Sequence, residues 1–250
     1  MAPSEITHIA YNSGSVFLSP CFPNEGLTIY QIVNVLHNLG YEVTTVDVSE
    51  YNQMFIENLI KAFLAYGLPL IATLNVIDEK RKETKHAAVI SGYRINPETQ
   101  EIMKLYVHDD QIGPYSRVKF SKRDIYLWEN EWVENRGYKE VKLERLIIPL
   151  YHKIRMNYTY LYNKYFEDLL INIKDKKNVS SFLSDVVEYK KDILYRTMHQ
   201  TNSEIRSEIL ETQLPHYFWI IRIQTNNELN LDMLFDATQE KSHGPRLFRF

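Results

Sequence analysis

The segment from Leu70 to Phe120 constrains the fold more than any other part of the chain. It contains four short runs rich in apolar, β-branched and aromatic residues, separated by charged or turn-forming residues. The runs are 70–77, 86–93, 102–109 and 115–120. Runs of about four to eight such residues, bounded by Asn, Pro and Gly, predict strands that are joined by hairpins. We therefore expect an antiparallel meander.

Two helices and one extended segment are expected before this meander. Thr28 and Gln31 have the spacing of a capping box at the start of the first helix, and Gly40 ends that helix. The second helix covers about 52–66, where Ile, Leu and Phe recur on one face. The segment 41–48 between the two helices is rich in β-branched residues, which favours a strand.

The C-terminal half is expected to mix helices and strands. The expected elements are a strand at 146–151, helical regions at about 158–173, 180–196 and 203–210, and a hairpin at 217–235. The whole pattern predicts an α+β fold. Its core, helices packed on an antiparallel sheet, is expected in residues 1–125, and a mixed α/β extension in residues 126–250, at a boundary that the sequence marks only weakly.

Charge and composition exclude several classes of protein. The formal net charge of the 250 residues is -3, and acidic and basic residues are interspersed, which gives no footprint for nucleic acid or an anionic membrane. No apolar run approaches the roughly 20 residues of a membrane span, and the N-terminus lacks the signal-peptide pattern. The single cysteine, Cys21, excludes an internal disulfide and a Cys-rich zinc site. We expect a cytoplasmic protein without a cofactor; its oligomeric state is not predicted.

His86 and Asp109 are the candidate functional pair. His86 opens one expected strand and Asp109 closes the next, so a tight antiparallel hairpin brings the two side chains together. A carboxylate beside an imidazole fixes its tautomer and stabilises the imidazolium, as a base that serves a nucleophile requires. An ordinary surface hydrogen bond, worth well under about 1 kcal/mol, is the alternative explanation of the same pair.

The surroundings of this pair resemble a known family. A histidine at the head of an apolar strand that ends in Gly92-Tyr93, followed by a strand that closes on Asp109, is similar to the papain-like peptidases that trim leader peptides in bacteriocin export. The apolar strand from Leu68 and the helix opening Gly26-Leu27-Thr28 also fit that pattern. The resemblance covers roughly residues 25–120.

The resemblance implies a bacterial cysteine peptidase with a papain-like core. It implies that the substrate is a peptide or protein, that His86 is the general base and that Asp109 orients it. Asp110 is the alternative orienting residue, because the proline that usually follows the family's aspartate is absent. A peptidase-like module that binds a peptide or partner protein without catalysis is the alternative function.

The nucleophile is the open question. In the family that this chain resembles, the cysteine begins a long helix, where the helix dipole activates the thiol, and a Gln upstream supplies an oxyanion donor. Cys21 lies between Pro20 and Pro23, and residues 1–20 contain no Gln. Three explanations stay open: the cysteine helix lies upstream of this chain, the protein is a non-catalytic relative, or Cys21 reaches the site from a loop.

Two further features of the sequence carry weaker hypotheses. His108 beside Asp109 and Asp110 suggests a metal, but strand alternation points His108 to the opposite face from Asp109, so no metal is expected. The tyrosines of the first C-terminal helical region do not keep one helical face, which predicts that they are partly exposed and suggests a protein partner. They are Tyr158, Tyr160, Tyr162 and Tyr165.

Overall fold

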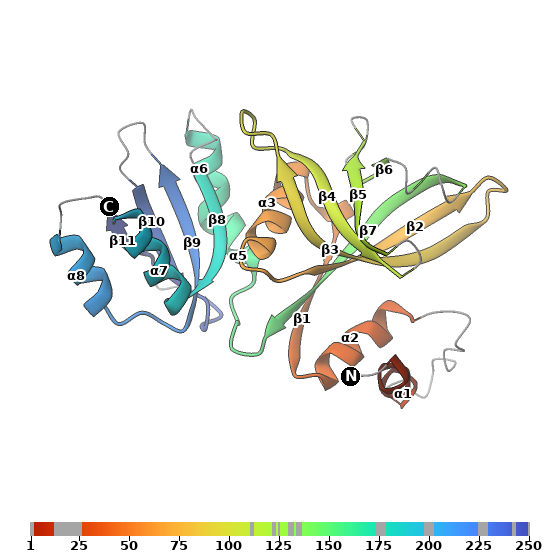
Figure 1. Cartoon of the computed structure of the whole chain (residues 1–250), viewed down its shortest axis with the longest axis horizontal. Helices are drawn as coiled ribbons and strands as arrows, with labels where there is room; N and C mark the ends of the chain where they lie inside the picture. Colours follow the sequence, from red (N-terminus) through yellow and green to blue (C-terminus); the bar gives the residue numbers. More distant parts are fainter. Residues whose placement is uncertain are drawn as a thin grey trace. The chain divides into compact units, whose positions relative to one another are not determined.

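The computed structural model shows a mixed α+β protein built on antiparallel sheets (Figure 1). The residues that it describes are 3–12, 27–110, 113–121, 124, 126–129, 133, 137–173, 179–197, 203–224, 230–241 and 244–249. None of the described helices is both long enough and apolar enough to cross a membrane.

Two compact units divide the chain, and neither unit is one continuous stretch. The first unit comprises Met1–Glu50, Pro69–Ser91 and Tyr106–His152, and the second comprises Tyr51–Leu68, Gly92–Leu105 and Lys153–Phe250. Each unit therefore takes residues from both sides of position 125, where the sequence placed its boundary.

A seven-stranded sheet has the strand order β1-β7-β2-β3-β4-β5-β6, and most of its residues belong to the first unit. The bounds of its strands are β1 Tyr41–Asp47, β2 Leu70–Asp78, β3 Glu83–Ile95, β4 Ile102–Asp109, β5 Gly113–Phe120, β6 Trp128–Glu129 and β7 Tyr138–Tyr151. The expected meander is present as β2 to β5. The strand expected at 146–151 is longer than the sequence predicted, because β7 pairs with β1 along one edge and with β2 along the other.

The sheet closes on itself into a barrel-like ring. Leu127 forms an antiparallel bridge with Lys142, and the Leu143 N–H donates to the Tyr126 carbonyl at 2.6 Å, so the region of β6 meets β7. Alternate residues of β2 face the interior, as period-2 alternation requires, and are almost completely buried. They are Leu70, Ala72, Leu74 and Val76.

Three helical segments complete the first unit: α1 (Pro3–Asn12), α2 (Ile29–Asn38) and the 3-10 turn η1 (Val48–Glu50). Helix α2 contacts both α1 and β1. The expected capping box of α2 is confirmed, since the Thr28 hydroxyl accepts from the Gln31 N–H at 3.2 Å and the Gln31 side chain accepts from the Thr28 N–H at 3.0 Å.

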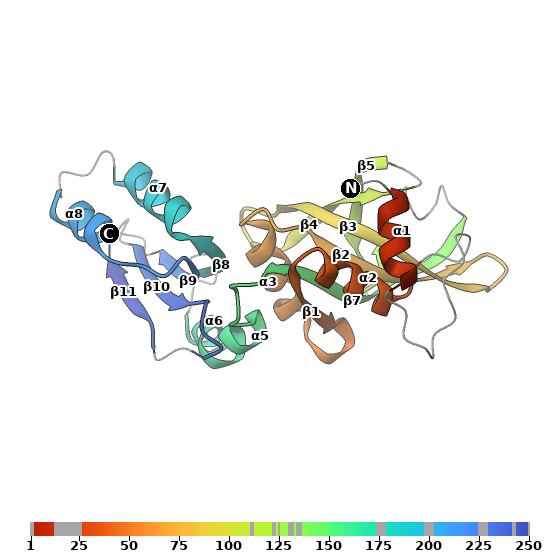
Figure 2. The ribbon, with the colours of Figure 1, turned by 90° about the horizontal axis from the view of Figure 1, so that it is seen from below.

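The second unit contains a four-stranded sheet in the order β11-β10-β9-β8. Its elements are α3 Gln53–Leu64, α5 Tyr158–Leu161, the π-helical turn η2 Tyr162–Phe166, α6 Glu167–Asn172, β8 Val179–Asp185, α7 Val186–Arg196, α8 Ser203–Glu211, β9 Tyr217–Gln224, β10 Asn230–Asp236 and β11 Arg246–Arg249. Figure 2 shows α7 and α8 on one face of this sheet and α5 and α6 on the other. The central strand β9 is therefore buried on both faces, which explains its nearly continuous apolar sequence.

The expected helix at 180–196 is wrong in its first part, because residues up to Asp185 form β8. The expectation that the tyrosine series is partly exposed is also wrong for two of its members. Tyr158 and Tyr162 are buried against Phe55 of α3, with ring centroids 5.9 and 4.9 Å away. Burial raises the pKa of Tyr162 to about 12. These two rings belong to the core of the second unit and are not a partner surface.

Asp185 is the N-cap of α7, and its negative charge is expected to stabilise the folded protein. Its carboxylate accepts from the N–H groups of Val187 at 2.8 Å and Glu188 at 3.0 Å, and the Tyr66 hydroxyl donates to it at 2.9 Å. Burial raises the pKa of the Asp185 carboxyl, but these hydrogen bonds outweigh burial and lower the pKa below 3.8. Because the pKa is lower in the folded state, the stabilisation is present above about pH 4 and is lost as the pH falls.

Asp185→Asn retains the capping oxygen and removes the charge. We expect this change to lower the free energy of unfolding by about 0.3–1 kcal/mol at neutral pH, and to have a smaller effect at a pH below the pKa of the folded state. Urea unfolding followed by circular dichroism at the two pH values tests this prediction. An equal loss at both pH values would show that the charge of Asp185 is not the source of the stabilisation.

Candidate functional site

The β2–β3–β4 part of the sheet positions the candidate pair. His86 on β3 lies directly opposite Leu74 of β2, so its side chain is on the interior face of the sheet. Asp109 ends β4, the neighbouring strand, and is buried. The turn between β3 and β4 is held by Asn96, whose side chain accepts from the Glu98 N–H at 2.8 Å.

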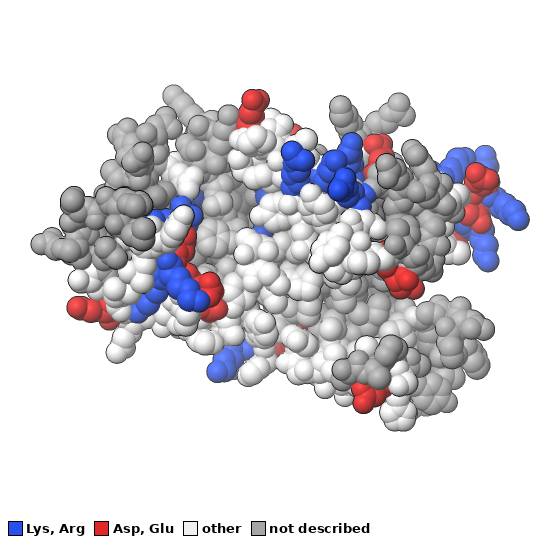
Figure 3. All heavy atoms as spheres, viewed as in Figure 1, with Lys and Arg blue, Asp and Glu red and all other residues white. Residues whose placement is uncertain are grey.

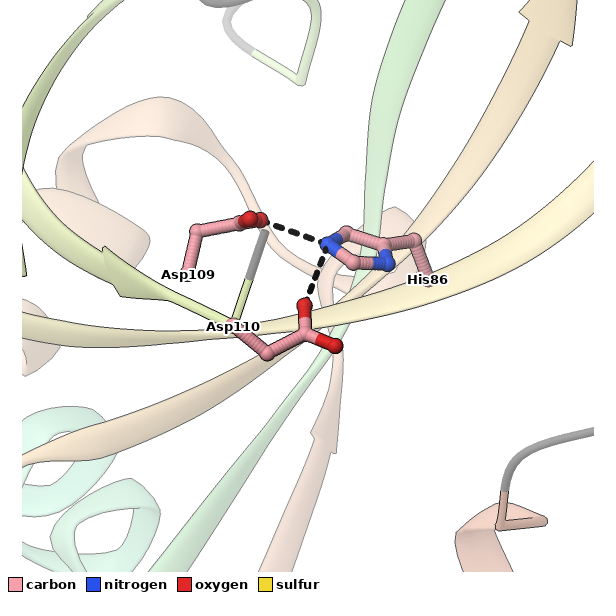
Figure 4. A group of neighbouring side chains, drawn as sticks. All are labelled: His86, Asp109 and Asp110. Atoms are coloured by element: carbon pink, nitrogen blue, oxygen red, sulfur yellow. Dashed lines mark hydrogen bonds and ion pairs between the residues drawn. The ribbon is translucent and has the colours of Figure 1, made fainter. Parts of the chain in front are cut away.

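His86 and Asp109 are in direct contact, as the hairpin predicted. The His86 Nε2 atom lies 2.6 Å from the Asp109 Oδ2 atom (Figure 4). The side chain of Asp109 is 0% exposed and that of His86 is 15% exposed. A buried carboxylate is costly unless it is hydrogen-bonded, so this contact is expected to fix both side chains. The pair is not the surface hydrogen bond that was the alternative explanation.

Asp110 has a different environment. Its Oδ1 atom lies 4.0 Å from the same His86 nitrogen, and its side chain is 75% exposed. Figure 4 shows both carboxylates directed to Nε2, while Nδ1 is on the far side of the ring. Asp109 is thus the hydrogen-bonded partner, and Asp110 adds a solvent-screened charge.

The hydrogen bond determines which ring nitrogen can act as a base. When Asp109 is ionised it only accepts, so Nε2 must carry the proton that joins the two groups. In the neutral imidazole the lone pair is then on Nδ1. A proton taken up at Nδ1 creates an imidazolium whose positive charge is stabilised by the Asp109 carboxylate. This is the arrangement that general-base chemistry requires.

The same three side chains also have the composition of a metal site. His86, Asp109 and Asp110 offer ligand atoms that all lie within 4.8 Å of one another. Two ligand atoms about 2.0–2.2 Å from a tetrahedral zinc ion lie roughly 3.4 Å apart. The 2.6 Å separation of Nε2 and Oδ2 is much shorter and fits a shared proton. The geometry therefore favours a hydrogen-bonded pair over a metal centre.

His108 does not join this group. Its ring contacts that of Tyr115 on β5, with centroids 4.9 Å apart, and its Nε2 atom is buried without a hydrogen-bond partner in the part of the chain that the structure describes. Cys21, the remaining predicted site residue, lies outside the described residues. The structure thus brings two of the three predicted catalytic residues together.

A second charged cluster, in the second unit, was missed by the sequence analysis. Arg222 of β9 makes two hydrogen bonds to Asp232 of β10, at 2.7 and 2.6 Å, and an ion pair with Asp192 of α7 at 2.8 Å. The signal was a charged residue inside each of two apolar segments that lie close together in the sequence. Because the charges of this cluster are paired with one another and Arg222 and Asp232 are buried, we interpret the cluster as structural.

The chain matches no protein-family model, no curated protein and no solved structure. The class of site is therefore defined by geometry alone: a part-buried histidine oriented by a fully buried carboxylate.

Proposed function

We propose that this chain is a cysteine-peptidase-like hydrolase that acts on a peptide or protein. The proposed fold of the part that carries the seven-stranded sheet is a papain-like core. The observation that carries the proposal is the 2.6 Å contact between His86 Nε2 and the buried Asp109 carboxylate. An apolar environment and a fixed carboxylate are what a histidine needs to serve as general base.

The roles follow from the chemistry of the pair. His86 accepts the nucleophile's proton at Nδ1, and Asp109 holds the ring and stabilises the imidazolium. In the active form of this chain the nucleophile is Cys21, since it is the single cysteine of the sequence. The thiolate then attacks the scissile carbonyl, and the imidazolium returns the proton to the leaving amine.

Alkylation of Cys21 across pH tests this assignment. We expect a fluorescent iodoacetamide to label wild-type protein rapidly at about pH 6, because a neighbouring imidazolium favours the thiolate. His86→Ala should move the midpoint of labelling towards the ordinary thiol range near pH 8.5. Because the chain has one cysteine, total labelling reports Cys21 directly.

His108→Ala is the matched control, since it removes a histidine that makes no contact with Asp109 among the described hydrogen bonds. It should leave the labelling profile unchanged. A wild-type midpoint near pH 8–9 that His86→Ala does not move would contradict the hydrolase. Circular dichroism of each variant separates a lost interaction from a lost fold.

A further inference from the structure

The second unit contains a small cavity where β10 ends and β11 begins. Its lining residues come from these two strands, from the segment between them and from the segment that leads from α8 into β9. They include Leu214, Pro215, Leu234, Asp236, Gln239 and Arg246. The cavity has a volume of about 220 Å³, below the range of roughly 300–1,000 Å³ that is typical of sites for drug-sized molecules. A ligand that fills this cavity is therefore a small molecule.

The strand register places the apolar and the charged residues of this cavity on one face of the sheet. Leu234 of β10 lies directly opposite Arg246 of β11, and Asp236 follows Leu234 by two residues. Opposite residues on neighbouring strands, and alternate residues of one strand, share a face. On this face Leu234 belongs to a buried apolar cluster with Ile220 of β9, against which Leu214 packs. The cavity thus has an apolar floor, with a carboxylate and a guanidinium beside it.

These two charges have hydrogen bonds but no ion pair. The Asp236 carboxylate accepts from the Thr238 N–H at 2.9 Å, from the Thr238 hydroxyl at 2.6 Å and from the Gln239 side chain at 2.9 Å. The Arg246 guanidinium donates to the Gln213 carbonyl at 2.5 Å. Neither side chain forms an ion pair with any residue that the structure describes. The hydrogen bonds hold both side chains in place, and the guanidinium keeps further N–H donors for a ligand.

Other charged side chains of the second unit differ from these two in being paired. Arg196 of α7, for example, lies 2.7 Å from Asp192. In Figure 3 the region where Figure 1 places α7 shows Lys and Arg side chains next to Asp and Glu side chains. Glu240 and Lys241 follow the cavity residue Gln239, but they balance each other and are not among its lining residues. The cavity therefore offers one unpaired charge of each sign.

The spacing of the two charges suits a single small zwitterion. Asp236 and Arg246 are diagonal neighbours across the β10–β11 pair, because Arg246 lies opposite Leu234. The Cα atoms of diagonal neighbours are about 7–8 Å apart. An α-amino acid carries its ammonium and carboxylate groups on one carbon atom, so one such molecule can contact both side chains at once.

We propose that this cavity binds a free α-amino acid with an apolar side chain. Arg246 binds the carboxylate of the ligand, Asp236 binds its ammonium group, and Leu234 contacts its side chain. Hydrogen bonds between oppositely charged groups are roughly twice as strong as neutral ones, so each charge of the ligand contributes to its recognition. The site lies within the second unit, and its binding does not depend on the proposed hydrolase activity.

Isothermal titration calorimetry of the full chain with L-leucine tests the proposal. Two further probes each lack one charge, since isocaproate has no ammonium group and isoamylamine has no carboxylate. We expect the wild type to bind L-leucine at least tenfold more tightly than either. Arg246→Gln should raise the Kd for L-leucine at least tenfold and change the Kd for isoamylamine by about twofold or less. Asp236→Asn should do the same for L-leucine and isocaproate.

Arg155→Gln and Asp168→Asn are the matched controls. They remove the same charges from exposed positions of the second unit that do not line the cavity, and should change the Kd for L-leucine by about twofold or less. Retained binding of the probe without the lost partner shows that a cavity variant is folded.

Three results would overturn the proposal. The first is the absence of saturable binding of L-leucine to the wild type. The second is equal affinity of the wild type for L-leucine and for either probe that lacks a charge. The third is equal weakening by a cavity variant and its matched control, since net charge alone would then govern binding.

Discussion

Replacing Arg222 with alanine is expected to lower the free energy of unfolding of the second unit by about 3–5 kcal/mol. The Arg222 side chain is 3% exposed, and its partner Asp232 is 0% exposed. The guanidinium satisfies both oxygens of that carboxylate and also contacts Asp192. Removing it leaves a buried charge without its counter-ion, and the cost of that charge exceeds the value of the original pair.

Two control variants give this prediction its specificity. Arg222→Met combined with Asp232→Leu removes both buried charges, and we expect it to cost much less than Arg222→Ala alone. Arg196→Ala breaks a partly exposed pair with Asp192, at 2.7 Å, and should cost less than about 1 kcal/mol. Urea unfolding followed by circular dichroism measures all three. A loss below about 1 kcal/mol for Arg222→Ala would show that water reaches and solvates Asp232.

Asp109→Asn is expected to slow alkylation of Cys21 at about pH 6 by tenfold or more. Asparagine has nearly the same shape as aspartate, so the ring of His86 keeps its position. It lacks the negative charge that stabilises the imidazolium, and its amide nitrogen can donate, which favours the wrong tautomer. Less imidazolium means less thiolate at a pH below the ordinary thiol range.

Asp110→Asn is the matched control for this charge. It removes a neighbouring carboxylate that is 4.0 Å from the same nitrogen and largely exposed, so the alkylation rate should change by about twofold or less. If the two variants slow the reaction equally, the effect is a general one of local charge and Asp109 has no special role. At pH 9 both variants should react like the wild type, because the thiolate then forms without help.

The candidate pair was predictable because the signals that define it are local. Strand periodicity fixed the faces of β3 and β4, and the turn at Asn96-Pro97 fixed their approximate pairing. Which of the two aspartates, Asp109 or Asp110, forms the hydrogen bond to His86 could be decided only from the structure. Asp109 is the last residue of β4 and Asp110 follows it, and a shift of one residue would exchange their faces.

The second unit was less predictable because the secondary structure of some of its segments depends on long-range packing. Ser180 to Asp185 continues directly into a helical pattern, and β9, which makes it a strand, comes more than thirty residues later in the chain. The helix start was nevertheless present in the sequence as a capping residue, Asp185. Likewise, the apolar face of α3 predicted burial, but the sequence could not show that residues after Lys153 would cover it.

The position of β7 imposes an order of events during synthesis. β7 lies between β1 and β2 in the sheet, yet it is translated about sixty residues after β2. Until β7 emerges, the facing edges of β1 and β2 have unpaired N–H and C=O groups and β-branched side chains. The pairing that joins β1 to the rest of the sheet therefore cannot form before β7 has been synthesised.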